Sequence, residues 1–237
     1  MSEIAVITGG SSGIGRAVAL SLADEGCSVA VVGRDEERLR EVSAEAGDKV
    51  AARWYRADLR SEDEISALSK RIENDLGRVD VLVHAAGIIS LGEVALTSTS
   101  EIDEQYEVNL RAPLLLTREL LPMIQSVRGQ IVFINSSAGL DRGVAGKASY
   151  SSTKHGLRAL ADSLREEVNP RGIRVLSVFP GSTATPMQEG LHDSDGRVYR
   201  PERLLKPEDV ASAVVFCLKL PGSAEITELS IRPMLKP

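Results

Sequence analysis

The sequence predicts an α/β protein with a single doubly wound parallel sheet whose two faces are covered by helices. Short, continuous apolar runs such as 4–7 and 29–32 are typical of strands that are buried on both faces. Segments with apolar residues at helical spacing separate these runs. The strict alternation of strand and helix, without a repeat or linker, indicates parallel strands in one domain covering residues 1–237.

The apolar patterns place the elements in order along the chain. Expected strands cover 4–7, 29–32, 50–57, 79–83, 131–134, 173–178 and 226–231. Expected helices cover 13–25, 36–46, 62–76, 98–125, 149–168 and 210–220. Gly26 and Gly77 follow the first and third helices as stop signals, and Pro113 predicts a kink in the fourth. Residues 181–206 contain polar residues, Pro and Gly, and are expected to form a loop.

Composition excludes several classes of protein. Of 237 residues, 43% are hydrophobic and 26% are charged, which excludes a disordered chain. The net charge of -6 does not favour nucleic-acid binding, and no apolar run reaches the ~20 residues that a membrane helix needs. The N-terminus lacks the basic start of a signal peptide, and Cys27 and Cys217 fit reduced, buried thiols. We therefore expect a cytoplasmic protein with no nucleic-acid or membrane partner.

A glycine-rich turn, TGGSSGIG at residues 8–15, links the first expected strand to the first expected helix. Glycines there permit a tight turn and let backbone N–H groups approach a pyrophosphate at the helix N-terminus. The spacing, G-x-x-x-G-x-G, differs from G-x-G-x-x-G. A P-loop is the competing interpretation, but Arg16-Ala17 stands where that motif needs Lys-Ser/Thr. The turn therefore favours a dinucleotide.

Tyr150 and Lys154 are four residues apart in an expected helix and so face the same side of it. A phenol with a pKa near 10 is a poor base at pH 7, and a nearby ammonium favours the phenolate. At ~4 Å and an effective dielectric of ~20 the attraction is ~4 kcal/mol, an upper bound of about three pKa units. By itself, this pair would fit an ordinary solvated helix face. Ser137, 13 residues before Tyr150 at the end of an expected strand, adds a hydroxyl that can bind a substrate oxygen beside the phenol.

Taken in order, these motifs resemble the short-chain dehydrogenase/reductase family over nearly the whole chain. The matching positions are 8–15, Asp58, His84-Ala85-Ala86-Gly87, Asn109, Ser137, Tyr150 with Lys154, and Pro180-Gly181 followed by Thr183 and Thr185. The resemblance implies a Rossmann fold and an enzyme that transfers a hydride between a nicotinamide cofactor and a carbonyl or alcohol.

The resemblance also implies catalytic roles. Tyr150 would be the general acid/base, and Ser137 would hold the substrate oxygen and stabilise the developing alkoxide. Lys154 would bind the nicotinamide ribose and lower the pKa of Tyr150. Asn109 would support a chain of water molecules that carries protons from Lys154. Ser136 is the less favoured serine, because the family's spacing points to Ser137.

Further residues would line the cofactor by the same resemblance, with Asp58 at the adenine amino group. They are Gly9, Ser11, Ser12, Gly13, Ile14, Gly15, Arg34, Asp58, Leu59, Ala86, Gly87, Pro180, Gly181, Thr183 and Thr185, together with Tyr150 and Lys154. The family commonly has Asn-Asn-Ala-Gly where this chain has His84-Ala85-Ala86-Gly87, so His84 is expected to be a structural replacement. His155 and His192 have no metal-ligating partners at a suitable spacing, and no metal is expected.

The end of the second expected strand bears on the choice of cofactor. An NAD site places Asp or Glu there to bind the ribose 2′-OH. Here Val32 is followed by Gly33 and Arg34, whose guanidinium can pair with a 2′-phosphate. Asp35 opposes this interpretation, but it is better placed to cap the next helix, which begins with two glutamates. NADP(H) is therefore favoured over NAD(H).

The sequence is less specific about the substrate. A lid is expected at 186–206, and its mixture of apolar and charged residues does not favour a long apolar substrate. Arg142, Arg197, Arg200 and Arg203 could bind a carboxylate, although each also fits a surface arginine. The segment 224–233 resembles NADP-dependent serine and 3-hydroxy acid dehydrogenases, which implies a small polar substrate. Family members are usually dimers or tetramers, so the resemblance implies a homodimer or homotetramer joined through 98–125 and 147–169.

Two other classes share parts of this pattern. A methyltransferase that binds S-adenosylmethionine would share the glycine turn but would not need Ser137, Tyr150 and Lys154. A catalytically inactive relative acting as a cofactor sensor or scaffold would tend to lose the tyrosine or the lysine, and this chain keeps both.

Overall fold

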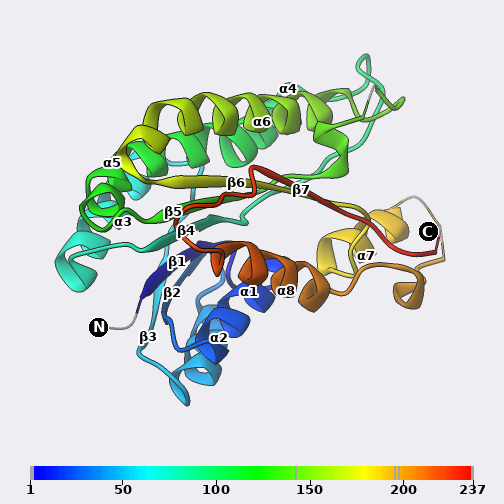
Figure 1. The fold of residues 1–237 in the computed structure, drawn as a ribbon. Coiled ribbons are helices and arrows are strands. Elements are labelled where there is room, and N and C mark those ends of the chain that lie inside the picture. The colour runs from blue at the N-terminus through cyan, green and yellow to red at the C-terminus, as the bar shows by residue number, and fades with distance from the viewer. Residues whose placement is uncertain (1–2, 142, 195, 197, 236–237) are drawn as a thin grey trace.

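One parallel sheet with the strand order β3-β2-β1-β4-β5-β6-β7 organises the chain (Figure 1). This is a computed structural model, and it describes residues 3–141, 143–194, 196 and 198–235. The strands are β1 (Ile4–Thr8), β2 (Ser28–Gly33), β3 (Ala52–Arg56), β4 (Val81–His84), β5 (Gln130–Ile134), β6 (Arg174–Pro180) and β7 (Glu228–Ile231). The predicted doubly wound sheet is confirmed, and the strand boundaries differ from the predicted ones by a few residues.

Helices cover both faces of the sheet (Figure 1). On one face lie α1 (Gly13–Asp24), α2 (Glu36–Gly47) and α8 (Pro207–Leu218); on the other lie α3 (Glu62–Leu76), α5 (Ala112–Val127) and α6 (Ala148–Val168). Successive residues of a strand point to opposite faces of the sheet. Ile7 packs in the buried cluster under α1, α2 and α8, and Val6 packs in the cluster under α3, α5 and α6. Because both faces are covered, the strands read as continuous apolar runs.

The expected kink at Pro113 is present as a change of helix type. The predicted helix at 98–125 divides into α4 (Thr99–Tyr106), a π-helical turn at Glu107–Arg111, and α5. Proline has no N–H, so Pro113 cannot donate the helical hydrogen bond to the carbonyl of Asn109, four residues earlier. The distortion is therefore centred on a predicted catalytic position.

The prediction of a loop throughout 181–206 is wrong in part. Residues Pro186–Ser194 form α7, and Pro201–Arg203 form a short 3-10 turn. The Thr185 hydroxyl accepts a hydrogen bond from the Gln188 N–H at 3.3 Å, and Pro186 occupies the first helical position, where its missing N–H costs nothing. A capping hydroxyl followed by proline was the helix-start signal that the polar composition obscured.

The strand order reverses between β1 and β4, at the centre of the sheet. Thr8 and His84 are register partners at the ends of these two strands. The Thr8 hydroxyl accepts hydrogen bonds from the N–H groups of Ala85 and Ala86, both at 3.2 Å, and so joins the segments that follow the two strands. A crevice at such a switch point is where doubly wound sheets bind ligands. Among the described residues, no helix has the length and apolarity needed to cross a membrane.

Candidate active site

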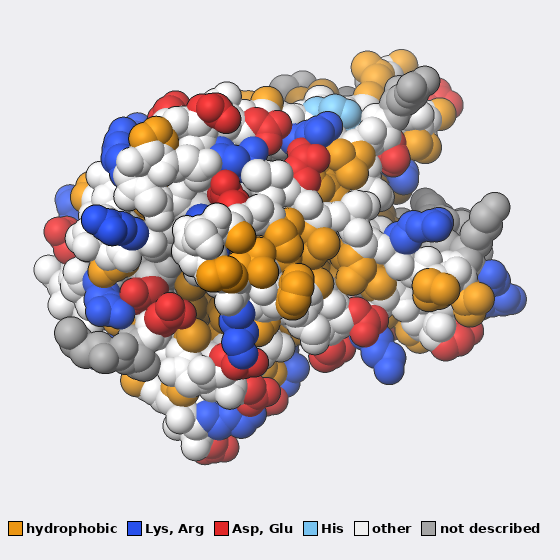
Figure 2. Space-filling model, viewed as in Figure 1, with side chains coloured by type: hydrophobic (Ala, Val, Ile, Leu, Met, Phe, Trp, Pro, Cys, Tyr) orange, Lys and Arg blue, Asp and Glu red, His pale blue; other side chains and the backbone are white. Residues whose placement is uncertain are grey.

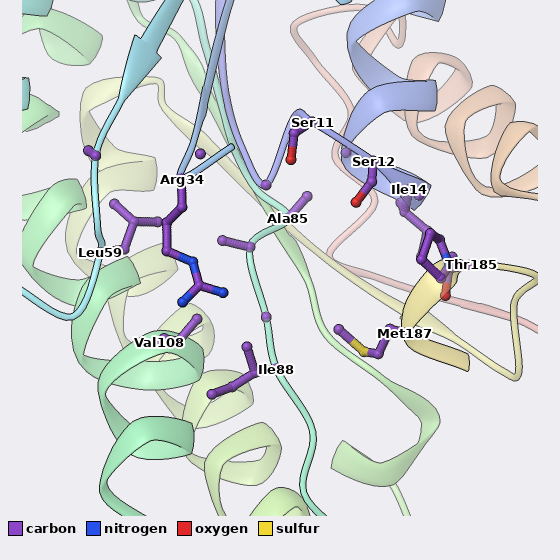
Figure 3. Close-up of a pocket in the computed structure, with 18 of the residues that line it drawn as sticks. Ser11, Ser12, Ile14, Arg34, Leu59, Ala85, Ile88, Val108, Thr185 and Met187 are labelled. Atoms are coloured by element: carbon purple, nitrogen blue, oxygen red, sulfur yellow. The ribbon is translucent and has the colours of Figure 1, made fainter. Parts of the chain in front are cut away.

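A cavity of about 260 Å³ opens at the switch point (Figure 3). Its walls include the turn between β1 and α1, and Ser11, Ser12 and Ile14 lie along one side. Gly9 has φ +65°, and a Cβ there would lie 2.7 Å from the Ala86 nitrogen. The turn therefore lies against the chain after β4 more closely than any side chain would allow, and it leads directly into the N-terminus of α1.

Arg34 extends its guanidinium into this cavity from the end of β2 (Figure 3). The side chain is exposed, and none of the described carboxylates pairs with it. Asp35 does not line the cavity, because its carboxylate caps α2 by accepting a hydrogen bond from the Arg38 N–H at 3.2 Å. The predicted capping role of Asp35 is confirmed.

Asp58 lies on the same wall as Arg34, just after β3. Its carboxylate accepts hydrogen bonds from the Arg60 Nε at 3.1 Å and Nη2 at 2.6 Å, and this guanidinium holds the pKa of Asp58 below its usual value. The Asp58 N–H donates to Glu64 at 2.8 Å. These bonds keep an ionised acceptor at the rim of the cavity.

A second cavity of about 270 Å³ continues from the first and shares Ile14, Gly87, Ile88, Thr185 and Met187 with it. The predicted residues divide between the two. Gly9, Ser11, Ser12, Gly13, Ile14, Gly15, Arg34, Asp58, Leu59, Ala86, Gly87 and Thr185 line the first, and Ser137, Tyr150, Lys154, Pro180, Gly181, Thr183 and again Thr185 line the second. Together the two cavities form one continuous crevice.

Tyr150 and Lys154 both face the second cavity from α6, and the Lys154 Nζ lies 5.8 Å from the centre of the Tyr150 ring. Burial raises the pKa of Tyr150, while a hydrogen bond from the Ser136 hydroxyl lowers it. The lowering of this pKa by Lys154, which the resemblance implies, stays a prediction.

Of the two neighbouring serines, Ser136 is the one whose hydroxyl acts on the pKa of Tyr150. The Ser136 Oγ also accepts a hydrogen bond from the Ala138 N–H at 3.2 Å, which orients the hydroxyl. The Ser137 hydroxyl lines the same cavity without a hydrogen-bond partner among the described residues. This geometry differs from the expectation based on family spacing, and the role predicted for Ser137 stays a prediction.

Lys154 is buried and donates a hydrogen bond from Nζ to the Ile134 carbonyl at 3.2 Å. Burial lowers the pKa of Lys154 to about 8. An amine with this pKa can exchange a proton near neutral pH.

Two buried asparagines hold the catalytic elements together. The Asn109 Oδ1 accepts from the Ile88 N–H at 2.8 Å, and its Nδ2 donates to Ile88 and Thr153. Sequence reasoning missed Asn135, whose Nδ2 donates to the Lys154 carbonyl at 3.1 Å while its Oδ1 accepts from the Ser136 N–H at 2.9 Å. An amide directly after a buried strand was the available signal.

His84 has a structural environment, as expected. The ring stacks on Phe133 with centroids 5.0 Å apart, and its Nε2 lies 2.8 Å from the Thr117 hydroxyl. Burial lowers the pKa of His84 to about 3, so the ring is neutral at pH 7. Among the residues that are described, no three His, Cys, Asp or Glu side chains gather to hold a metal ion.

Comparison with known proteins identifies the family. Residues 3–196 match the family model of the short chain dehydrogenases. The chain belongs to this family. An uncharacterized oxidoreductase of Staphylococcus epidermidis is 30% identical to this short chain dehydrogenase over 233 residues, which cover 98% of this chain and 97% of the relative. Another, from Staphylococcus saprophyticus, is 30% identical over 236 residues and covers the same shares.

Solved structures extend the comparison. An alcohol dehydrogenase from the archaeon Thermococcus sibiricus, complexed with 5-hydroxy-NADP, has a TM-score of 0.90 at 29% identity and covers 100% of this chain and 99% of its own. A serine dehydrogenase complexed with NADP+ has a TM-score of 0.86 at 26% identity, and the match covers 97% of this chain and 94% of that one. An actinorhodin polyketide ketoreductase variant with NADPH has a TM-score of 0.88 at 32% identity, and the match covers 97% of this chain and 95% of that one.

Proposed function

We propose that this short chain dehydrogenase is an NADP(H)-dependent oxidoreductase acting on a carbonyl or secondary alcohol of a small, polar substrate. The observation that carries the proposal is the meeting of Tyr150, Lys154 and a serine hydroxyl in a cavity that continues into a dinucleotide-sized crevice. The solved relatives that hold NADP-type cofactors support it.

The crevice fits such a cofactor. The first residues of α1 line the cavity beside Ser11 and Ser12, and the free N–H groups of a helix N-terminus suit a pyrophosphate. Gly87 lines both cavities and so lies where the two halves of the crevice join. Arg34 would pair with a 2′-phosphate, and Asp58 would accept from the adenine amino group.

When bound, the nicotinamide would supply or accept the hydride. The protein's own residues would donate or accept the proton at the substrate oxygen. In the direction of reduction, Tyr150 donates its phenolic proton to the substrate oxygen while the Ser136 hydroxyl hydrogen-bonds that oxygen and favours the alkoxide-like charge. Lys154 would bind the nicotinamide ribose and, with its lowered pKa, pass protons toward Asn109 and solvent.

Five finer expectations belong to this proposal. The chain would act as one domain over 1–237, with 186–206 as the lid over the substrate. It would be cytoplasmic and would assemble as a homodimer or homotetramer through the helices at 98–125 and 147–169. It would bind neither nucleic acid nor membranes.

The test is a screen of small carbonyls and alcohols monitored by NADPH absorbance, with Tyr150→Phe beside the wild type. We expect turnover of at least one compound and its loss in the variant. Fluorescence enhancement of NADPH on binding, with no effect of S-adenosylmethionine, would separate the proposal from a methyltransferase. NADPH binding without turnover of any carbonyl would instead support an inactive sensor or scaffold and overturn the proposal.

A further inference from the structure

The cavity around Tyr150 is positively charged. Its charged lining residues within the described ranges are Lys147 and Lys154, and no described carboxylate lines it. Lys154 is buried, and its Nζ donates a hydrogen bond to the Ile134 carbonyl. Lys147 is only partly buried and has no ion pair or side-chain hydrogen bond within the described part of the chain. One cation in the cavity is thus left without a counter-ion.

The position of Lys147 relates it directly to the reacting group. Lys147, Tyr150 and Lys154 follow one another at spacings of three and four residues, so they lie on one face of α6, with Lys147 as its N-terminal cap. At ~1.5 Å of rise per residue, Lys147 lies ~4.5 Å along the axis from Tyr150, on the side away from Lys154. Lys147 therefore lines the cavity on the side of Tyr150 away from Lys154, and we expect the rest of a substrate to extend there beyond the reacting oxygen.

The remaining wall does not supply another charge. Leu91, Met187 and Leu191 are apolar, and Gln188 is neutral. Of the four arginines considered above as carboxylate ligands, Arg142 and Arg197 lie outside the described residues, and Arg200 and Arg203 do not line the cavity. An unpaired ammonium beside apolar walls favours a ligand that carries its own negative charge.

We propose that the substrate is an oxo acid, or the corresponding hydroxy acid, whose carboxylate binds Lys147 a few bonds from the carbonyl at Tyr150. This inference rests on the proposed function and deepens it. In the reduction, the carbonyl carbon would accept the hydride that bound NADPH supplies, which forms a C–H bond. The carbonyl π electrons move to oxygen, which takes the proton of Tyr150 to form the O–H bond. The products are the hydroxy acid and NADP+, and Tyr150 regains its proton from solvent through Lys154.

The kinetic test compares acids with their neutral esters. Pyruvate, acetoacetate and levulinate, each beside its methyl ester, place the charge at three distances from the carbonyl. For the best-fitting pair we expect kcat/KM of the wild type to favour the acid by about tenfold to a hundredfold, the range of a charge-assisted hydrogen bond. Lys147→Gln should abolish that preference by raising KM for the acid, with the ester unchanged within about twofold. Lys147→Glu should reverse it.

Lys70→Gln is the matched control, because it removes the same charge from α3, which contributes no residue to the cavity. It should keep the preference for the acid. Equal turnover of acid and ester by the wild type in all three pairs would overturn the inference. So would an equal loss of acid and ester activity in Lys147→Gln, since that result indicates a structural role.

A binding measurement separates failure of this inference from failure of the proposed function. Butyrate and butyramide resemble the ligands but cannot react. In the presence of NADP+, butyrate should raise the melting temperature of the wild type more than butyramide does, and Lys147→Gln should respond equally to both. This difference would support the anion site even if every oxo compound tested were inert, and its absence would overturn the inference even in an active enzyme.

Discussion

Replacing each of the two neighbouring serines by alanine tests which of them holds the substrate oxygen. Ser136 is oriented by the Ala138 N–H at 3.2 Å and donates toward Tyr150. Its hydroxyl is therefore preorganised where negative charge develops. Removing one such donor costs about 10²–10³ in kcat, or ~3 kcal/mol, so Ser136→Ala should lose activity by that factor. The Ser137 hydroxyl has no hydrogen-bond partner among the described residues. We therefore expect kcat of Ser137→Ala to stay within about twofold of the wild type, which corresponds to a change of less than ~0.5 kcal/mol.

The assay measures kcat and KM with saturating NADPH across pH. The Ser136 hydrogen bond lowers the pKa of Tyr150. Ser136→Ala should therefore also move the pKa of the pH–rate profile upward, whereas Ser137→Ala should leave the profile in place. Ser136→Thr keeps a hydroxyl and should recover part of the activity. A hundredfold loss in Ser137→Ala with near-normal Ser136→Ala would refute the reasoning and restore the assignment made from family spacing.

Three further predictions follow from the crevice and the core. Arg34→Glu should shift the ratio of the Michaelis constants for NADP+ and NAD+ toward NAD+ by about tenfold or more, since a carboxylate repels a 2′-phosphate; an unchanged ratio would contradict the assignment. His84 has a pKa of about 3 in the folded protein, against 6.5 for an ordinary histidine, so below pH 6.5 the unfolded chain binds more protons than the folded one and stability decreases as the pH is lowered. At pH 5 this decrease is ~2 kcal/mol. Urea unfolding at pH 7.5 and pH 5 should show a smaller loss for His84→Asn than for the wild type, and equal losses would exclude this role. Gly9→Ala should lower the melting temperature more than Gly26→Ala, because both have positive φ but only Gly9 would drive a Cβ to 2.7 Å from the backbone of Ala86; equal shifts would show that the close approach costs nothing.

Most of the fold follows from local pattern. Strands such as β1 and β2 are buried on both faces, so each is a continuous apolar run, and the helices between them end at Gly26 or Gly77. The same alternation indicates where the crevice lies, because the carboxyl ends of β1 and β4 must meet at the switch point. The glycine turn and Arg34, which the sequence predicts to bind the cofactor, line the cavity at this point.

What the sequence could not show depends on contacts between distant segments. The helix at 186–194 is short and polar, so its start signal at Thr185 and Pro186 carried little weight against the composition. In the sequence Lys147 is indistinguishable from an ordinary surface lysine. The structure shows that it lines the cavity three residues before Tyr150, and this position is the basis of the role that we propose for it. The sequence offers four arginines as possible carboxylate ligands. The two that the structure describes, Arg200 and Arg203, do not line the cavity.

For the two serines, the spacing along the chain and the contacts in the structure point to different residues. Counting 13 residues back from Tyr150 crosses the segment 140–147, which joins the 3-10 turn at Ser137–Gly139 to α6 and can change length without disturbing either. Counting forward from β5 crosses no loop. Ile134 is held by its register with Val178, and Asn135 is tied to the Lys154 carbonyl, so the next residue, Ser136, is fixed relative to α6. The position of a side chain at a strand end is set by the sheet and by the groups that bind that end, and for this reason we predict that Ser136 holds the substrate oxygen.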